Sequence, residues 1–580
     1  MQHIQCEKNY VHSIAVFRRF QYSLVACIAI ASAGPHIACA QSPPDAGALL
    51  KQLEQQQQRN TLPRESEPKF VPPPPLESLG GATVVVKTFQ FAGNTLLSNQ
   101  QLAPSVTSFV NRPLEFTELQ NAAIAVASVY RKAGWVVRAY LPQQDVTGGA
   151  VTIQIIEGKF GAVHVQGEAK HASSSQLTRL VETSQIPGTP VNAEQLDRAL
   201  LLIDDLPGVS AKGRLSEGRN QAETDLMLAV NDSPLMSYDM AADNAGARYT
   251  GAGRFIADLA LNSPFGFGDR GSALLLHSEG SDYGRASYSV PIGSRGLRIG
   301  VNGSHLAYDI VTPEFSALEA QGTSTTVGLD ANYPLLRSRT KNLYWTVTAD
   351  DKRFDNESAG VTTTDYKVRA AGIGLYGNVY DTYGGGGANS ASITFVQGSL
   401  NLDGSPNEEA DALTTDTAGS FSKLTFSASR QQAISEILSL YASVSGQFAN
   451  KNLDSSEKFY LGGSNGVRAY PANEGGGSEG LLLNLEARAG LPSGFNMTGF
   501  FDWGTIHVNK KNDFAGATAQ NRGDLKGVGV SLAWTSSFGL NLRATLARRI
   551  GENPIPSGTG DDQDGSLIKN RFWLQASLSL

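Results

Sequence analysis

The final ten residues of the chain, RFWLQASLSL at positions 571–580, carry an apolar side chain at every second position. Phe572, Leu574, Ala576, Leu578 and Leu580 share one face of an extended segment, because successive side chains of a strand point to opposite faces. The length matches the roughly nine to eleven residues that a tilted strand needs to cross a bilayer. The pattern predicts a membrane-spanning β-strand.

Similar alternating segments recur from this strand back to about residue 235, and they predict sixteen strands in a meander. We place them near residues 235–243, 253–262, 270–279, 282–292, 296–308, 322–334, 341–354, 365–380, 387–400, 420–434, 438–451, 481–490, 495–506, 526–536, 538–549 and 571–580.

The connections between these segments differ in length. From the fifth strand on, long polar connections such as 401–419, 452–480, 507–525 and 550–570 alternate with tight ones such as 435–437, 491–494 and 537. Long external loops and short periplasmic turns are typical of bacterial barrels, whose termini lie in the periplasm. Residues 234–580 are therefore predicted to form a sixteen-stranded antiparallel transmembrane β-barrel in the outer membrane. A soluble propeller or solenoid is the alternative, but we find no repeat of about 40 residues to support it.

The composition agrees with an all-β membrane protein. Hydrophobic residues make up 41% of the chain, and outside the N-terminus no apolar run reaches the roughly 18 residues of a membrane helix. A chain of this kind suits a membrane when every second residue faces lipid and the others face a wet lumen. The formal charge of −7 argues mildly against a nucleic-acid partner.

Residues 1–40 have the features of a secretory signal peptide. Lys8, Arg18 and Arg19 precede an apolar run at 24–33, and the small residues at 38–40 fit a cleavage site. All three cysteines lie in this segment, so the predicted mature chain has none, as suits an oxidising periplasm. Cys39 as a lipoprotein cysteine is the alternative, but His36 stands where that signal needs an aliphatic residue.

Residues 41–59 precede a proline-rich linker at 60–82. A short helix is predicted at 45–59, with Asp45 as its N-cap and with Leu49, Leu50 and Leu53 as a narrow apolar stripe. So short a helix is not stable alone. From composition it is either an element that docks elsewhere or a disordered tail.

Two segments with the same order of elements fill residues 83–158 and 159–233. Each is predicted as a strand, two helices and two strands. The first has strands at 84–91, 135–141 and 150–156 and helices at 98–110 and 116–132. The second has strands at 161–165, 209–216 and 223–230 and helices at 174–182 and 192–205. Each unit leaves a sheet edge that can accept an extended peptide. Spacer domains are the alternative, but a position next to the mouth of a barrel favours peptide capture.

At this point the chain resembles a known family, the two-partner secretion transporters, also called TpsB or haemolysin activator proteins. Their fold is two POTRA domains before a sixteen-stranded barrel. The stretch LGGSNGVRAY at 461–470 resembles the family's VRGY/F loop motif, and GFFDWG at 499–504 resembles its F-x-D-x-G strand motif. The motif positions are Gly466, Val467, Arg468, Ala469 and Tyr470 in the loop and Phe500, Asp502 and Gly504 in the strand. Further support comes from DNAG at 243–246, YTG at 249–251, NSPFGFGD at 262–269 and SYSVP at 287–291.

Two positions depart from the family pattern. Ala469 replaces the motif glycine, which is expected to alter the turn of the loop, and Leu580 replaces the usual terminal aromatic, which is expected to weaken recognition by the barrel-assembly machinery.

The two motifs suggest a contact inside the barrel. A long loop carrying Arg468 can fold back into the lumen, where Asp502 offers a bidentate carboxylate, and such a lock would hold the loop inside. Judged from the residues alone, the favoured alternative is a solvated Arg468 on the surface, with Asp502 simply lining a wet lumen. The resemblance favours the lock, and it implies that the helix with Leu49, Leu50 and Leu53 is a pore plug that leaves when substrate arrives.

The resemblance also implies the function. The expected partner is a secreted exoprotein with an N-terminal two-partner secretion domain, which would add to a POTRA edge, pass the lumen as an extended chain without nucleotide hydrolysis and fold outside. Outer-membrane lipid, periplasmic chaperones and the assembly machinery are further expected partners. A barrel-assembly insertase is the main alternative. A porin would lack the repeats, and a nutrient receptor would need a larger plug domain.

Three stretches match motifs for catalysis or nucleotide binding, but none has the structural context that its motif requires. GGSNG at 462–466 and GGSEG at 476–480 match G-x-S-x-G, and GIGLYG at 372–377 matches G-x-G-x-x-G. None lies between a strand and a following helix, as the chemistry requires. The eight histidines have no ligand spacing. We therefore expect no enzyme activity, no cofactor and no metal site.

Overall fold

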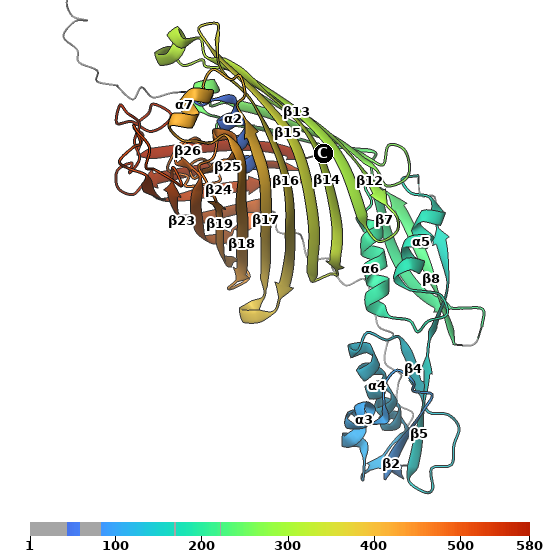
Figure 1. The fold of residues 1–580 in the computed structure, drawn as a ribbon. Helices are drawn as coiled ribbons and strands as arrows, with labels where there is room; N and C mark the ends of the chain where they lie inside the picture. Colours follow the sequence, from blue (N-terminus) through green and yellow to red (C-terminus); the bar gives the residue numbers. More distant parts are fainter. Residues whose placement is uncertain (1–42, 58–82, 168–169, 221, 580) are drawn as a thin grey trace, which may run out of the picture.

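In the described part of the chain, sixteen antiparallel strands close into a barrel (Figure 1). The computed structural model describes residues 43–57, 83–167, 170–220 and 222–579. The predicted signal peptide, the proline-rich linker and Leu580 lie outside the described residues. Each barrel strand pairs with its neighbours in sequence, and the last strand, β26, closes on the first, β9. This confirms the predicted fold class.

Every predicted strand segment corresponds to one barrel strand. They are β9 (Met236–Asp243), β10 (Arg254–Asn262), β11 (Arg270–Ser278), β12 (Ser281–Ile292), β13 (Leu297–Asp309), β14 (Gln321–Arg337), β15 (Lys341–Ser358), β16 (Val361–Asp381), β17 (Gly387–Asn401), β18 (Gly419–Ala433), β19 (Leu438–Ala449), β22 (Glu479–Gly490), β23 (Phe495–His507), β24 (Arg522–Thr535), β25 (Leu540–Arg549) and β26 (Asn570–Ser579).

One connection was predicted wrongly. The polar stretch between β15 and β16 reads as a loop of about ten residues, but both strands run on to a two-residue turn at Ala359 and Gly360. Both turn residues have positive φ, 50° and 74°, as a tight hairpin requires. The end of this hairpin has no apolar row facing lipid. Its polar sequence therefore lacks the alternation that predicts a membrane strand.

The alternation separates a lipid-facing side from a wet lumen. On β17, Ile393 and Phe395 are exposed on the outer face, while Ser390 and Ser392 point inward and share hydrogen bonds of 2.7 Å with Ser429 and Ser427 of β18. Within the described residues, no helix is long and apolar enough to span a membrane.

Two α+β units precede the barrel. In the first, the sheet order is β2 (Thr88–Ala92), β5 (Ala150–Glu157), β4 (Val137–Tyr140); in the second it is β6 (Lys159–Gln166), β8 (Glu223–Asp232), β7 (Val209–Glu217). In both units the first strand runs parallel to the central strand. The short strands β1 (Val84–Val85) and β3 (Pro113–Leu114) pair with each other in the first unit. The repeated topology agrees with the predicted repeat.

The helices of these units follow the prediction with one correction. Helix α4 (Phe116–Lys132), helix α5 (Ser174–Ser184) and helix α6 (Ala193–Asp204) form as expected. The predicted helix at 98–110 is instead one α turn, α3 (Asn99–Leu102), followed by a 3₁₀ segment, η1 (Ala103–Phe109). Pro104 lies in the first turn of the 3₁₀ segment and has no N–H for an α-helical hydrogen bond, so the α turn does not continue.

The second unit lies against the short-turn end of the barrel, and the first unit lies farther out (Figure 1). Two arginines of the barrel anchor it: Arg337 pairs with Asp205 at 2.8 Å, and Arg339 pairs with Asp197 at 2.7 Å. Arg198 donates in return to the carbonyl of Pro334 at 3.0 Å. The units therefore sit at the lumen entrance on the side of the short turns.

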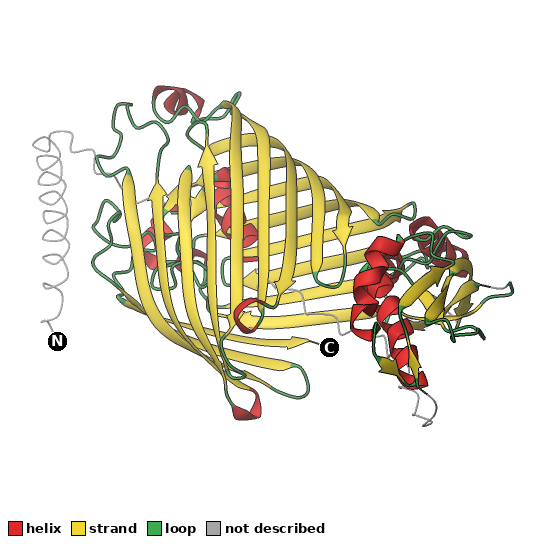
Figure 2. Ribbon diagram, turned by 90° about the horizontal axis from the view of Figure 1, so that it is seen from below, coloured by secondary structure: helices red, strands yellow, loops and turns green. Residues whose placement is uncertain are grey.

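Helix α2 (Ala46–Gln57) lies inside the barrel, against β13, β14 and β15 (Figure 2). It matches the helix predicted at 45–59, with the last two positions outside the described residues. Of the two interpretations of this segment, docking is the one that the structure supports.

Candidate functional site: the lumen helix and the inner loop

The connection between β19 and β22, residues 450–478, folds into the barrel, and we call it the inner loop. It contains a 3₁₀ turn, η5 (Ser455–Glu457), and a small hairpin of β20 (Phe459–Tyr460) and β21 (Gly476–Gly477). Its apolar residues pack on the barrel wall. The cluster comprises Leu461, Val467, Ala469 and Tyr470 of the loop with Leu482, Phe500, Ile506, Leu525, Ala547 and Ile555. The loop is therefore a packed element.

Arg468 of the inner loop and Asp502 of β23 form a bidentate ion pair. The Nε–Oδ2 distance is 2.9 Å and the Nη2–Oδ1 distance is 2.7 Å, and the backbone N–H of Arg468 also donates to Oδ2 at 3.1 Å. The Asp502 side chain is 0% exposed and that of Arg468 12%. The structure thus brings together the two residues that the motifs suggested, and it rules out a solvated Arg468.

Sequence reasoning missed two further partners of Arg468. Glu486 on β22 accepts from Nη1 at 2.9 Å, and the indole N–H of Trp573 on β26 donates to the Arg468 carbonyl at 2.8 Å. The guanidinium also lies 3.5 Å from the ring centre of Phe500. Although burial opposes its charge, Asp502 and Glu486 raise the pKa of Arg468 above its usual range. Glu486 could have been found, because it pairs in register with motif residue Phe500 and so shares its inward face.

The remaining motif residues shape the turn that presents Arg468. Gly466 lies so close to the chain that a Cβ there would be 2.0 Å from the Leu461 carbonyl oxygen. The N–H of Tyr470 donates to the Val467 carbonyl at 3.0 Å and closes the turn. Ala469 is fully buried, and its methyl group faces Gly527 of β24, where an added Cβ would be 2.7 Å away. The turn therefore forms with alanine at this position, provided that Gly527 leaves the space.

The N-terminal end of α2 is attached to both the wall and the inner loop. Asp45 caps the helix by accepting from the N–H of Ala48 at 2.8 Å, and it also accepts from the Ser455 hydroxyl at 2.8 Å. The N–H of Ala46 donates to Asn356 of β15 at 2.9 Å. At Gly47 an added Cβ would be 2.6 Å from the Tyr366 hydroxyl. A larger residue at position 47 would have to displace this hydroxyl group.

The leucine stripe of α2 lies on the barrel wall, as its amphipathic pattern predicts. Leu49, Leu50 and Leu53 are buried. Their apolar cluster includes Tyr249, Leu306, Tyr308, Phe354, Tyr366 and Val368. Burying three leucines is worth roughly 1.5–3 kcal/mol each, which supports docking of a helix that is unstable alone.

Four charged residues join α2, the wall and the inner loop, and we call them the Lys–Glu cluster. Glu54 of α2 lies 3.1 Å from Lys352 of β15, Lys352 lies 3.5 Å from Glu457 of the inner loop, and Glu457 lies 2.6 Å from Lys423 of β18. Burial opposes the ionisation of Glu457, but the lysines hold its pKa well below the usual range. The cluster contains equal numbers of positive and negative groups, so each charge is compensated inside the barrel.

The C-terminal end of α2 is held as well. Arg254 of β10 donates to the Gln56 side chain, and Asn465 of the inner loop donates to the Gln56 carbonyl at 3.2 Å. The helix thus contacts the wall on one side and the inner loop on the other, so that both elements occupy the lumen together.

A second contact joins the inner loop to the connection between β25 and β26, which we call the last outer loop (550–569). Buried Glu474 accepts from Asn553 at 3.0 Å and from the N–H of Gln563 at 2.8 Å. Burial, with Asp562 and Asp564 nearby, raises the pKa of Glu474 to about 7. Sequence patterns gave no sign of this contact, because it joins two irregular loops.

The lumen wall outside these contacts carries many small hydroxyl groups, with charged residues such as Arg285, Asp330 and Asp350 among them. Direct pairing in register places on the lumen face Ser272, Ser287, Ser304, Thr326, Thr348, Thr394, Ser427 and Ser445. Neutral hydroxyls offer weak, replaceable hydrogen bonds to a moving chain. Across the described ranges, no group of three or more His, Cys, Asp and Glu residues is placed to hold a metal ion.

Comparison with known proteins identifies the family. The profile of the haemolysin secretion/activation proteins ShlB/FhaC/HecB matches residues 222–533, and the ShlB-type POTRA domain matches residues 84–158. The heme/hemopexin transporter protein HuxB of Haemophilus influenzae is 27% identical over 494 residues, 83% of this chain and 84% of HuxB. The outer membrane transporter CdiB of Dickeya dadantii is 22% identical, over 83% of this chain and 87% of CdiB.

Solved structures agree on the fold. CdiB from Escherichia coli superposes with a TM-score of 0.66 at 19% identity, covering 93% of this chain and 99% of that one. BamA from Haemophilus ducreyi, without its POTRA domains 1–3, gives a TM-score of 0.52 at 13% identity, covering 86% and 100%. The fold is thus shared by transporters and by BamA, so it does not separate the two by itself.

Proposed function

Because the chain belongs to the haemolysin secretion/activation family of two-partner secretion transporters in the outer membrane, we propose that it recognises one partner exoprotein and secretes it from the periplasm to the cell surface. The POTRA units lie in the periplasm in this family, so the short-turn end of the barrel faces the periplasm. The proposal rests above all on one observation: α2 and the inner loop fill the lumen and are held there by replaceable polar contacts.

We propose that this arrangement is the closed state. The Arg468–Asp502 pair locks the inner loop, and the Lys–Glu cluster together with the stripe of Leu49, Leu50 and Leu53 holds the plug helix. Opening would require both elements to leave the path of the substrate. An entering polypeptide can replace the ionic contacts stepwise, and the leucine stripe must separate from the wall as the helix leaves.

The substrate would first bind in the periplasm. In the described part of the chain, β2 and β4 pair only with β5, and β6 and β7 only with β8, within their main sheets. The start of β6 is already bonded on its outer side, because Phe160 exchanges hydrogen bonds with Gly188 and Thr189. The other outer strands, β2, β4 and β7, are therefore the better candidates for an added strand. We propose that the N-terminal two-partner secretion domain of the exoprotein adds at one of these edges.

Passage would then need no nucleotide. The hydroxyl-lined wall lets an extended chain exchange weak hydrogen bonds as it slides, and folding of the exoprotein outside disfavours its return. HuxB is named a heme/hemopexin transporter, so a haem- or haemopexin-binding exoprotein is the first candidate cargo to test.

A barrel-assembly insertase is the second candidate, and the seam of the barrel argues against it. Strands β26 and β9 pair over residues 575–579 and 239–243. Asn244 extends this pairing, because its side chain accepts from the N–H of Leu574 at 2.8 Å and donates to the carbonyl of Phe572 at 2.9 Å. A closed seam with an added side-chain clasp does not favour lateral release of strands into lipid.

Secretion in a reporter strain tests the proposal. The protein is co-expressed with candidate exoproteins, and the medium is assayed for wild type, Arg468→Ala and Asp502→Ala. Arg369→Ala is the matched control, because this arginine also pairs with an aspartate, Asp351 at 2.9 Å, but on the exposed outer face. We expect release of one exoprotein that falls with the first two variants alone. If no exoprotein is released and the outer-membrane barrel content changes instead, the insertase function is correct.

A further inference from the structure

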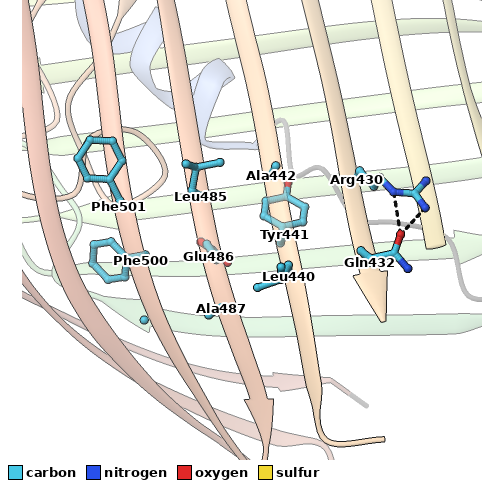
Figure 3. Close-up of a pocket in the computed structure, with 11 residues that line it drawn as sticks. Arg430, Gln432, Leu440, Tyr441, Ala442, Leu485, Glu486, Ala487, Phe500 and Phe501 are labelled. Atoms are coloured by element: carbon cyan, nitrogen blue, oxygen red, sulfur yellow. Dashed lines mark hydrogen bonds between the residues drawn. The ribbon is translucent and has the colours of Figure 1, made fainter. Parts of the chain in front are cut away.

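The outer wall of the barrel has an open groove of about 510 Å³ on strands β18, β19, β22 and β23 (Figure 3). Pocket volumes of roughly 300–1,000 Å³ are typical of small-molecule sites. The groove is outside the lumen and shares none of the contacts of the plug helix, so it needs an occupant of another kind.

The register of the sheet shows that the groove faces the membrane. Directly paired residues of antiparallel strands lie on the same face. One such row runs through Arg430, Ala442, Leu485 and Phe501, and a second runs through Gln432, Leu440, Ala487 and Gly499. The alternate row, with Tyr441, Glu486 and Phe500, faces the lumen, since Glu486 and Phe500 contact Arg468.

Small residues create the hollow. Ala442, Ala487 and Gly499 lie next to the larger Leu440, Leu485 and Phe501. At Gly499 an added Cβ would meet no atom within 4 Å, so the missing side chain leaves open space. Lipid-facing surfaces usually carry larger apolar groups, and this shape suits the passage of a flexible hydrocarbon chain.

One end of the groove is charged. Arg430 lies 2.7 Å from Asp381 at the end of β16, and it also donates to Asn389 at 2.6 Å and to Gln432 at 3.1 Å. The guanidinium is therefore fixed in position, yet 34% of the Arg430 side chain and 30% of the Asp381 side chain are exposed. A compensated pair offers one positive and one negative group side by side, with no net charge.

This pair lies near the periplasmic end of the barrel wall, where lipid headgroups are expected. Arg430 lies three residues before the end of β18 at Ala433, close to a periplasmic turn. At about 3.3 Å per residue, it is roughly 10 Å along the strand from that end. Charged groups are tolerated at this interface, whereas at the bilayer midplane they are costly.

We propose that the groove binds a phospholipid with a zwitterionic, amine-bearing headgroup from the periplasmic leaflet. Its phosphate lies at Arg430, taking the place of the Gln432 amide, and its ammonium lies at Asp381. One acyl chain lies over Ala442, Ala487 and Gly499. An anionic headgroup fits less well, because Asp381 would repel it.

Native mass spectrometry of the purified full-length protein, titrated with phosphatidylethanolamine or phosphatidylglycerol, tests this. Gly499→Leu fills the hollow, and the double variant Arg430→Gln/Asp381→Asn removes the charges but keeps their shape. Ala391→Leu is the matched control for the first, because Ala391 is exposed on the outer face of β17 at a similar distance from its periplasmic turn. Arg369→Gln/Asp351→Asn is the control for the second, because it removes an outer-face pair at the opposite end of the barrel.

We expect one phosphatidylethanolamine per wild-type chain, at a concentration that leaves phosphatidylglycerol unbound. Retention should fall about tenfold in both groove variants, equivalent to about 1.4 kcal/mol, and remain unchanged in both controls. Equal retention in Gly499→Leu and Ala391→Leu would mean ordinary boundary lipid and overturn the proposal. Equal binding of the two lipids would also overturn it. A dimer of the protein that Gly499→Leu abolishes would overturn it as well, because the groove would then be an interface between two copies. The assay does not depend on secretion, so its failure leaves the transport function untouched.

Discussion

Lys352 on the barrel wall and Glu54 on the plug helix form an ion pair with an N–O distance of 3.1 Å, inside the lumen and 298 residues apart in sequence. This pair connects the helix directly to the barrel. Lys352 also lies 3.5 Å from Glu457, so one wall residue contacts both elements that fill the pore.

Replacing Lys352 with methionine should open the pore. The change keeps most of the length of the side chain but removes a cation shared by two carboxylates. Glu457 then keeps Lys423, and Glu54 keeps only its contact with Lys51 of the same helix, at 3.4 Å. Breaking a buried pair from one side costs about 3–5 kcal/mol, which corresponds to a shift of roughly a hundredfold to several thousandfold toward the undocked helix. We expect more frequent open-channel events in planar bilayers.

Lys367→Met is the control for this variant, because Lys367 is exposed on the outer face of β16. Conductance equal to wild type in Lys352→Met would mean that the leucine stripe and the contacts at the two ends of the helix hold it without the cluster. The role given to the Lys–Glu cluster would then be wrong.

A disulfide between the plug helix and the inner loop should block secretion reversibly. A Cβ at position 47 would lie 3.0 Å from the Cβ of Ser456, slightly closer than the roughly 3.5–4.5 Å of a disulfide. The bond forms if the hydroxyl groups of Tyr366 and Ser455, 2.6 and 2.7 Å from that Cβ, move aside. The three native cysteines lie in the predicted signal peptide, so no other thiol competes after export. Gly47→Cys/Ser456→Cys should secrete only after reduction.

The single variants Gly47→Cys and Ser456→Cys show what each substitution does without the cross-link. Secretion at wild-type level by the oxidised double variant, with the cross-link verified by mass spectrometry, would mean that helix and loop need not separate. The proposal that both elements must leave the path of the substrate would then be wrong.

Much of this fold can be predicted from the sequence, because the residues of a barrel strand that face lipid recur at every second position. The alternation of Phe572 and Leu574 gives the face of β26 without any knowledge of its neighbours. The same parity identifies Glu486 as inward-facing. It does not say at what height Glu54 meets Lys352, because that height depends on where a tethered helix stops inside a closed barrel.

The Arg468–Asp502 pair was predictable only through the family motifs, and the contact of Glu474 with the last outer loop was not predictable at all. Irregular loops carry no periodic signal, and their contacts depend on side-chain packing between segments about 80 to 90 residues apart. The contacts on which gating would depend therefore lie in irregular segments, which sequence patterns predict least well.

The contact at Glu474 should strengthen in acid. Its folded-state pKa of about 7 lies above the usual carboxyl value, so the protonated form is favoured in the docked state. The stabilisation is complete below about pH 4.5 and is lost as the pH rises through 7. The difference is on the order of 3 kcal/mol. Protection of the amides in the last outer loop from hydrogen exchange, expressed relative to the intrinsic exchange rate at each pH, should therefore be greater at pH 5.5 than at pH 8.

Glu474→Gln should remove this pH dependence, whereas Glu552→Gln should retain it, because Glu552 is exposed and pairs with Lys569 at 2.6 Å. Asp562 and Asp564 face the same region, together with Arg549 and Arg571, which bind them. A pH dependence that persists in Glu474→Gln would assign the titration to these aspartates instead.

Ala469 and Gly527 should behave as an interchangeable pair. A methyl group on Gly527 would come within 2.7 Å of the Ala469 methyl group, so Gly527→Ala should destabilise the folded barrel by about 1–3 kcal/mol through overpacking. Ala469→Gly in the same chain removes the facing methyl group and should restore stability. Heat modifiability on SDS gels, read as the temperature at which the folded band disappears, measures both effects.

Ala469→Gly alone should cost little, because a glycine fits the same turn. If the double variant is no more stable than Gly527→Ala, the two methyl groups do not compete for one space. The alanine in the loop motif is then tolerated for a reason other than the space at Gly527.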